Sequence, residues 1–257
     1  MTRESENRIP AVKVIGLGGI GAAVAQAMAQ FLAYEGGVEA LWLIDGDGYE
    51  ERNRARVRFA EAGNKALVKA RELGAGAGGG LAVLGIPEYV TPRNAGRLLA
   101  DGDVVFMAVD NHATRKLVSD RCRRLDDVVV ISGGNDGIEA GRRGTFGNVQ
   151  VYVRRGGREV TNALTRAHPE VARPADRRPD QPGCGALVAA APQLLFTNLA
   201  VAAAMLGAFH AWRAGTLDYE ELYLDIATGT MVPVKRALPP SRPPERRRPG
   251  APGGPDR

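Results

Sequence analysis

Cysteine is scarce in this chain, which has Cys122 and Cys184 in 257 residues. Two cysteines are too few for a disulfide framework or a four-cysteine zinc site, and no Cys-x-x-Cys pair occurs. We therefore expect no zinc site. Aromatic residues are also few, whereas Ala, Gly and Arg are abundant. We interpret that balance as compositional bias rather than as a sign of function.

Residues 1–238 carry no large excess of positive charge. The net charge is +5, but residues 239–257 carry five Arg against Glu245 and Asp256, which is +3. Subtraction leaves +2 for the remainder, which is too balanced to indicate a nucleic-acid interface. The segment 239–257 is low-complexity Pro/Arg/Gly sequence, and we expect it to be a disordered tail.

Signals for export or for membrane insertion are also missing. The first ten residues are polar and do not resemble a secretory signal. The longest apolar run, 185–209, has almost the length of a membrane span, but Pro192, Gln193, Thr197 and Asn198 interrupt it. We expect a buried helix there, no membrane association and a cytoplasmic protein.

Apolar strand-like runs alternate with helical segments through the first half of the chain. In the helix expected after the first strand, Ile20, Val24, Met28 and Leu32 recur every four residues and predict one buried stripe. Continuous apolar strands that alternate with helices predict a parallel sheet covered on both faces. Strands are expected at 11–16, 39–45, 81–86, 103–109 and 127–133, and further helices at 64–74, 91–100 (capped by Thr91) and 111–125.

The second half has a different pattern. Residues 148–155 alternate like a half-exposed strand, and 221–236 resemble two strands joined by a Thr-Gly turn. A long loop is expected over about 155–186 and a helix over about 187–213. The predicted fold class is therefore α/β, with a Rossmann-like, doubly wound, mainly parallel sheet that antiparallel strands extend in the C-terminal half. We expect one domain over residues 1–238.

A glycine-rich turn stands between the first strand and the first helix. Gly16, Gly18, Gly19 and Gly21 lie in the sequence GLGGIG, which fits the GxGxxG pattern. Glycines there allow a tight turn and let phosphate approach the free N–H groups of the helix. Asp45 ends the second strand, where an acid can accept hydrogen bonds from ribose hydroxyls. Together these features predict a nucleotide site, although NAD, FAD and ATP proteins all share the glycine turn.

Five motifs follow one another in an order that carries more information than the turn alone. The motifs are GLGGIG (16–21), DGD (45–47), NRAR (53–56), NKALVKAR (64–71) and VDNHATR (109–115). In these motifs the chain resembles the ubiquitin-activating-like adenylyltransferases, the ThiF/MoeB/HesA family, over residues 12–235. The segment 168–184, Tyr219 and residues 224–229 are most similar to the ThiF-like proteins of the PRTRC plasmid-associated system.

The resemblance implies roles for individual residues. Asp45 would bind ribose, beside Asp47; Asn53 and Arg56 would contact the phosphates; Lys65 would neutralise the polyphosphate; and Asp110, next to Asn111, would hold Mg²⁺. A carboxylate would attack the α-phosphorus and release pyrophosphate, a reaction that Arg, Lys and Mg²⁺ assist by stabilising negative charge.

Two positions carry further expectations from the resemblance. Cys184 is a candidate acyl acceptor, because it follows a loop and precedes a helix N-terminus that would lower a thiol pKa. The alternative is that Cys184 is merely a small residue at a helix start. Cys122, inside an amphipathic helix, is expected to be structural. The family's usual glutamine after the motif arginine is Val57 here, and its paired zinc cysteines are missing.

The predicted function is ATP- and Mg²⁺-dependent adenylylation of the C-terminal carboxylate of a small ubiquitin-like or sulfur-carrier protein. The resemblance also implies a homodimer formed through the Ala-rich helix. Two alternatives stay open: a NAD-dependent Rossmann oxidoreductase, which gives Arg56, Lys65 and Asp110 no role, and a nucleotide-binding scaffold that has lost its chemistry.

Overall fold

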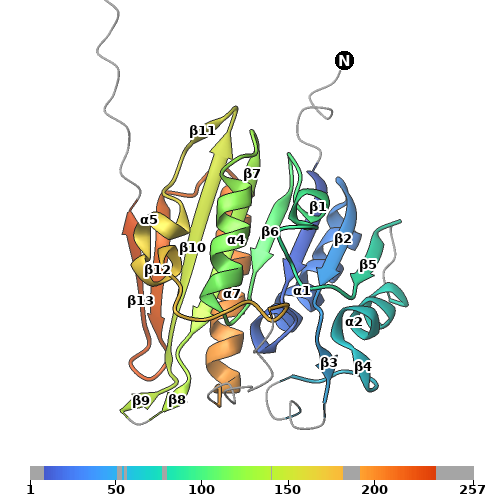
Figure 1. Ribbon diagram of the computed structural model, residues 1–257, viewed down its shortest axis with the longest axis horizontal. Helices are drawn as coiled ribbons and strands as arrows, with labels where there is room; N and C mark the ends of the chain where they lie inside the picture. Colours follow the sequence, from blue (N-terminus) through green and yellow to red (C-terminus); the bar gives the residue numbers. More distant parts are fainter. Residues whose placement is uncertain are drawn as a thin grey trace, which may run out of the picture.

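One mixed sheet organises the part of the chain that the structure describes. The computed structural model describes residues 9–50, 54, 57–76, 80–139, 141–181 and 192–235. Within these residues nine strands form the main sheet in the order β13-β12-β10-β7-β6-β1-β2-β5, with β11 paired to β10 (Figure 1). Its strands are β1 (Ile9–Ile15), β2 (Val38–Ile44), β5 (Ala82–Ile86), β6 (Val104–Met107), β7 (Val128–Asn135), β10 (Phe146–Arg155), β11 (Arg158–Glu159), β12 (Tyr219–Asp225) and β13 (Thr230–Lys235).

The sheet changes from parallel to antiparallel at β7. β5, β2, β1, β6 and β7 run parallel, whereas β10, β12 and β13 each pair antiparallel with their neighbour. This arrangement confirms the predicted fold class. Two short hairpins lie outside the main sheet and were not expected from the sequence. They are β3 (Gly48–Tyr49) with β4 (Gly63–Asn64), and β8 (Ile138–Glu139) with β9 (Arg142–Arg143).

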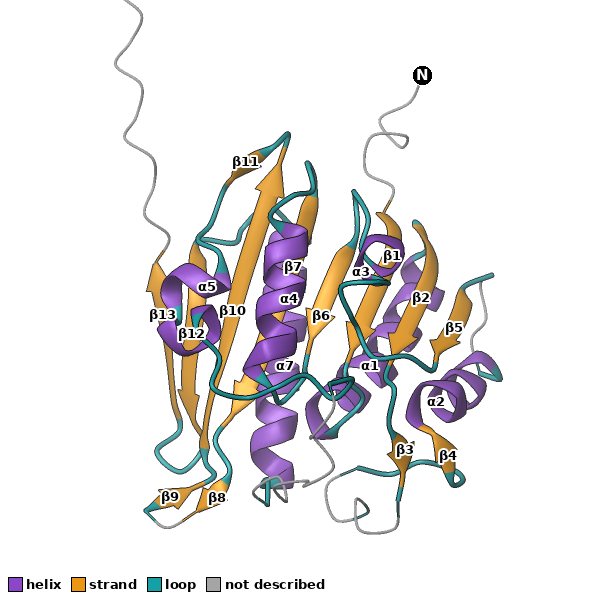
Figure 2. Ribbon diagram, viewed as in Figure 1, coloured by secondary structure: helices purple, strands orange, loops and turns teal. Residues whose placement is uncertain are grey.

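Helices cover both faces of the sheet, with two apolar clusters between the layers (Figure 2). Alternate residues of β6 show the division: Val104 and Phe106 join the α1 and α7 side, and Val105 and Met107 join the α4 side. The predicted stripe on α1 is buried at all four positions. The helices are α1 (Gly19–Glu35), α2 (Lys65–Gly74), α3 (Ala95–Leu98), α4 (His112–Cys122), α5 (Leu164–Ala167), α6 (Pro169–Ala172) and α7 (Leu195–Arg213).

Three expectations about helices need correction. The helix expected from Thr91 begins only at Ala95, because the Thr91 N–H donates to the Asn94 side chain (2.7 Å) and the segment forms a turn first. The region expected to be a long loop contains α5 and α6. The helix expected from about 187 is described only from Leu195; residues 192–194 are not helical, and 182–191 lie outside the described residues.

The helix α7 is long and apolar enough to cross a membrane by length and composition alone. Core helices of soluble proteins pass the same test. In this fold α7 packs against α1, β7 and β10, and one side of it, which includes Val201, Met205 and Phe209, lies in the apolar core. This placement agrees with the predicted buried helix.

Close packing of α2 on β5 supplies a test of the fold. A Cβ at Gly85 would lie 2.6 Å from the Ala66 carbonyl oxygen, which is backbone and cannot rotate away. We expect Gly85→Ala to lower the free energy of unfolding by about 1–3 kcal/mol in urea denaturation. Gly74→Ala is the matched control, because the nearest atom is 4.0 Å away. Equal stability of the two variants would contradict the packing described here.

Candidate functional site

A large cavity lies where the carboxyl ends of the parallel strands meet. Its volume is about 700 Å³, and its lining includes residues after β1, β2, β5, β6 and β7. In open α/β sheets, ligands bind in this crevice outside the strand ends. The cavity brings together most of the predicted site residues that the structure describes: Gly16, Gly18, Gly19, Asp45, Asp47, Lys65, Asp110 and Asn111.

The glycine turn is required by the packing of its backbone. Gly16 has a φ of +85°, and a Cβ there would lie 2.9 Å from the Ala108 carbonyl oxygen. A Cβ at Gly21 would lie 1.8 Å from the Gly16 carbonyl oxygen, so no larger residue fits at Gly16 or Gly21. Gly18, at the N-cap of α1, faces open space and has no side-chain cap. The start of α1 therefore presents bare backbone to the cavity.

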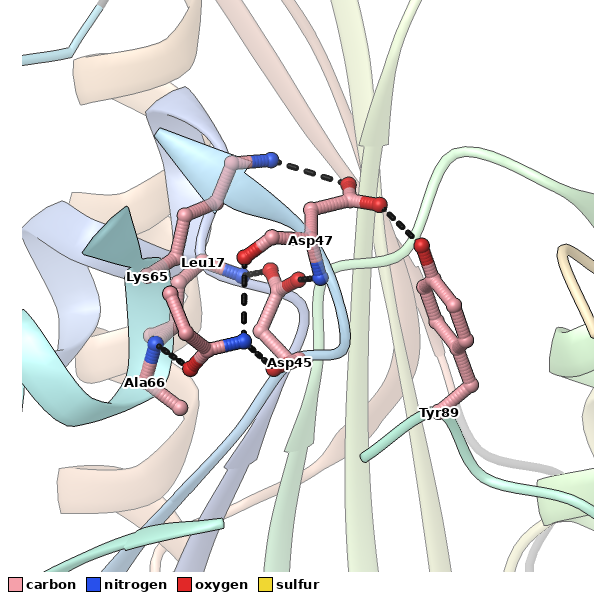
Figure 3. Close-up of polar contacts among 7 residues, drawn as sticks. Leu17, Asp45, Asp47, Lys65, Ala66 and Tyr89 are labelled. Carbon is pink, nitrogen blue, oxygen red and sulfur yellow. Dashed lines mark hydrogen bonds and ion pairs between the residues drawn. The ribbon is translucent and has the colours of Figure 1, made fainter. Parts of the chain in front are cut away.

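The Asp45 carboxylate joins this turn to the end of β2. Its two oxygens accept from the backbone N–H of Leu17 (2.6 Å) and of Asp47 (2.8 Å), as Figure 3 shows. The side chain is buried, and burial raises its pKa, while the Lys65 charge and the two N–H donors oppose that rise. The predicted ribose acid is thus fixed in orientation and keeps oxygen lone pairs for a ligand.

Asp47 lies between a lysine and a tyrosine. One of its carboxylate oxygens pairs with Lys65 Nζ at 2.9 Å, and the other accepts a hydrogen bond from the Tyr89 hydroxyl. The Tyr89 ring lies over Gly46, where a Cβ would come within 2.7 Å of the ring. Burial and the Asp47 carboxylate raise the pKa of Tyr89. Tyr89 could not be singled out from the sequence, because it lies outside the motifs.

Asn64 determines where α2 begins and ties that helix to the site. Its side-chain oxygen accepts from the N–H groups of Ala66 and Leu67, and its amide donates to the carbonyl oxygens of Asp45 and Asp47. The first helical residue is therefore Lys65, whose side chain lines the cavity. Lys69, one turn later, instead donates to the Arg58 carbonyl oxygen and pairs with Glu72. The structure thus separates a lysine at the site from a structural lysine.

The start of α4 supplies the next predicted pair. Asp110 is exposed and lines the cavity, whereas the Asn111 side chain caps the helix by accepting from the Thr114 N–H at 2.7 Å. The Asn111 side chain is therefore used to cap the helix, and Asp110 is the side chain of this pair that can face a ligand. The N–H groups of His112 and Ala113 donate to the Asp176 carboxylate at 2.7 and 2.9 Å. Asp176 belongs to the segment after α6 and was missed by the sequence analysis.

Arg115 ties the ends of two strands together beneath the cavity. Its guanidinium donates to the Val109 carbonyl oxygen (3.0 Å), Ser132 Oγ (3.0 Å) and the Gly133 carbonyl oxygen (2.8 Å). Burial lowers its pKa to about 10, and Asp110 and other carboxylates partly oppose the shift.

His168 connects α6 to β12 on the far side of the cavity. Its Nε2 lies 2.7 Å from a Glu221 oxygen and its Nδ1 lies 3.0 Å from a Glu170 oxygen. The Glu221 hydrogen bond raises the pKa of His168 against the opposing effect of burial. Both ring nitrogens therefore contact carboxylates, and the imidazole joins α6 to β12.

Several predicted residues cannot be placed. Asn53, Arg56 and Cys184 lie outside the described residues, as does the predicted tail from 239. Cys122 is buried in α4, and burial raises its pKa to about 12, in agreement with a structural role. Among the described residues no group of three His, Cys, Asp or Glu side chains is arranged to hold a metal ion.

The fold and this site define a Rossmann-like α/β protein with a glycine turn at β1 and an acid at the end of β2. A protein-family model described as the ThiF family matches residues 7–213. The chain therefore belongs to the ThiF family. No curated protein matches it.

Solved structures with the same fold are distant in sequence. PaaA is 17% identical with a TM-score of 0.63, and the match covers 91% of this chain and 66% of PaaA. E. coli MccB solved with ATP is 17% identical with a TM-score of 0.64, and the match covers 93% of this chain and 67% of MccB. MccB solved with MccA is 16% identical, with a TM-score of 0.64 and the same coverage. The chain thus spans about two thirds of the length of these neighbours.

The His168 cluster predicts a pH dependence of stability. Because its folded-state pKa is raised, its contribution is fully present below the unfolded value of about 6.5 and is lost as pH rises through the folded value. We expect the free energy of unfolding, measured in urea from pH 5 to pH 9, to fall over that window. His168→Gln should remove this part of the fall, whereas His210→Gln, on the exposed side of α7, should retain it. Identical profiles for wild type and His168→Gln would show that the cluster does not contribute.

Proposed function

We propose that this protein is an ATP-dependent adenylyltransferase that activates the C-terminal carboxylate of a small protein or peptide. One observation carries the proposal: the glycine turn, Asp45, the Asp47–Lys65 pair and Asp110 all line one cavity. The ThiF family membership supports it, and so does the fold shared with MccB, which has been solved with ATP and with MccA.

Each side of the cavity suits one part of a nucleotide. The bare start of α1 offers N–H groups to phosphate. Asp45, held by two N–H donors, would accept hydrogen bonds from the ribose hydroxyls. Lys65 lies beside Asp47 and would turn toward the polyphosphate when ATP is bound. Asn53 and Arg56 are proposed as further phosphate contacts from the resemblance alone.

A divalent cation fits the donor set at the start of α4. Asp110 offers one exposed carboxylate, and Mg²⁺ in nucleotide sites takes one or two carboxylates together with phosphate oxygens and waters. Such an ion would supply positive charge against the phosphates. Asn111 is committed to capping the helix, so Asp110 is the residue of this pair proposed to hold the ion.

The reaction requires little acid–base chemistry. A carboxylate oxygen of the substrate bonds to the α-phosphorus, the bond from that phosphorus to the bridging oxygen breaks, and pyrophosphate leaves with the electron pair. The product is an acyl adenylate. Catalysis then consists of positioning and of stabilising the charge on the phosphoryl oxygens, for which Lys65 and Arg56 are the proposed groups.

The partner proposed is a small ubiquitin-like or sulfur-carrier protein, as the family resemblance implies, and the protein is proposed to be of the PRTRC type. Cys184 is the candidate acyl acceptor. A homodimer through α7 is part of the same proposal. Its outer side carries Phe196 at 66% exposure and Leu199 at 46%, followed by exposed Ala203 and Gly207 on the same stripe. An apolar stripe of this kind suits helix packing between two copies.

Ligand stabilisation tests the nucleotide assignment. Mg–ATP at about a hundred times its Kd should stabilise the protein by roughly 2.7 kcal/mol, seen as a higher melting temperature. Asp45→Asn should abolish most of that shift, since it weakens an acceptor of the ribose. Stabilisation by NAD instead of Mg–ATP would support an oxidoreductase, and stabilisation without any adenylation of a partner would support a scaffold.

A second substitution tests the proposed cation site. Asp110→Asn should keep the melting temperature of the free protein, because Asp110 is exposed and forms none of the contacts that fix α4. It should lose the part of the ATP stabilisation that depends on Mg²⁺, and it should abolish ATP–pyrophosphate exchange with the cognate partner. Retention of the Mg²⁺-dependent part would rule out this role. Asp120→Asn, at the far end of α4, is the matched control.

A further inference from the structure

Arg115 is a partly buried cation on the wall of the cavity with no carboxylate in contact. Its side chain has five N–H donors, and three of them donate to neutral acceptors at the ends of β6 and β7. Among the described residues, no carboxylate lies within ion-pair distance of it, and the other two donors have no acceptor. The charges of Asp110, Asp176 and Glu170 act on it only from further away.

The surroundings hold the guanidinium in a fixed plane. Gly134 lies directly against it, since a Cβ there would come within 3.0 Å of its terminal nitrogen. Ser132, two residues earlier on the same face of β7, accepts one of its hydrogen bonds. A side chain at residue 134 would displace the guanidinium, so glycine at this position allows Arg115 to lie against the end of β7. Arg115 is therefore pre-organised, which reduces the side-chain entropy that the protein would lose when a ligand binds there.

A second polar group without a partner lines the same cavity. Thr114 is 4% exposed, and its Oγ1 has no hydrogen-bond partner among the described residues. Buried hydroxyls are normally satisfied, because leaving one without a partner costs about 1–3 kcal/mol. A hydroxyl without a partner and a guanidinium whose three hydrogen bonds all go to neutral oxygens both indicate a polar ligand at this wall.

We propose that Arg115, with Thr114 beside it, forms the subsite for the substrate carboxylate, separate from the nucleotide contacts at Asp45 and Lys65. This inference rests on the proposed function and specifies how the negatively charged carboxylate is held near a negatively charged nucleotide. The cavity lining is rich in acids, including Asp110, Asp136, Glu170 and Asp176, which repel a carboxylate. A planar, bidentate donor is the group that best offsets that repulsion.

We assign a carboxylate rather than a phosphate to Arg115 because the two ends of the cavity carry different groups. The glycine turn and Lys65 serve phosphate on the β1–β2 side. Arg115 lies on the β6–β7 side, and that part of the cavity continues to Asn148 on β10 and to His168. A substrate chain that enters past β10 would therefore bring its carboxyl end to Arg115 first.

The experiment compares two labelled hexapeptides that end in Gly-Gly, one with a free carboxylate and one with a terminal amide. Fluorescence anisotropy measures both with the full chain in saturating Mg²⁺ and α,β-methylene-ATP, whose α–β link cannot be cleaved. Wild type should bind the carboxylate peptide roughly tenfold more tightly than the amide. Arg115→Met should bind both alike while it retains stabilisation by the nucleotide.

Arg121→Met is the matched control, because Arg121 lies on the same helix, also donates to a backbone carbonyl oxygen, that of Leu99, and does not line the cavity. It should retain the tenfold preference. If Arg115→Met does not fold, Arg115→Lys keeps the charge without the planar fork and should weaken only the carboxylate peptide. Equal weakening of both peptides would overturn the subsite and leave Arg115 as a strand tie.

The outcomes separate this inference from the proposed function. If the nucleotide analogue does not stabilise wild type, the adenylyltransferase proposal is wrong and the subsite falls with it. If the analogue stabilises wild type but the two peptides bind alike, or if Arg115→Met loses nucleotide stabilisation and retains the carboxylate preference, only the carboxylate subsite is wrong.

Discussion

The geometry of the site depends on the buried Asp45 carboxylate. It accepts from Leu17 on the glycine turn and from Asp47 after β2, so it holds two loops from neighbouring parallel strands in one position. Asn64 then connects the backbone carbonyls of Asp45 and Asp47 to the start of α2, which places Lys65. Three segments that are distant in sequence thus share one polar junction. Burial disfavours the charge on Asp45, and the N–H donors and Lys65 oppose that cost.

A similar principle operates on the other half of the cavity with the charges reversed. There the central group is the Arg115 cation, and its partners are neutral oxygens at the ends of β6 and β7. The two halves therefore differ in charge: the Asp45 side has a carboxylate supported by N–H donors, and the Arg115 side has a cation that no carboxylate among the described residues contacts. A reaction between a nucleotide and a carboxylate would use both, since each half suits one reactant.

The parallel half of the fold could be predicted from the sequence because its strands are continuous apolar runs that end in Gly or Asp. A local signal at the end of a strand identified Asp45, and the family resemblance identified Lys65 and Asp110. All three lie at strand ends or helix starts and line one cavity. The start of α2 was also predicted within one residue, since Asn64 is a strong N-cap. The helix expected from Thr91 shows the limit of such signals, because Asn94 competes for the same backbone groups.

The parts that escaped prediction depend on contacts between distant residues. Tyr89, Asp176 and the His168–Glu221 pair have no local motif, and each meets its partner across more than forty residues of chain. The two short helices after residue 163 are a single turn each, which is too short for a periodic pattern. Sequence periodicity indicates which face of one helix or strand is buried. It contains no information about which loop contacts which side of the cavity.

The late position of α7 in the chain has a consequence for synthesis on the ribosome. The parallel strands from β1 to β7 are complete by residue 135, and β10 follows at once, but α7, which covers β7 and β10 on one face, ends only at Arg213. The apolar face over these strands therefore stays open while about sixty further residues are made, which takes several seconds at bacterial or eukaryotic rates. During that interval the side chains of Ile131, Val149 and Val151 are not covered by α7. The nascent chain is therefore most prone to aggregate before α7 has been synthesised.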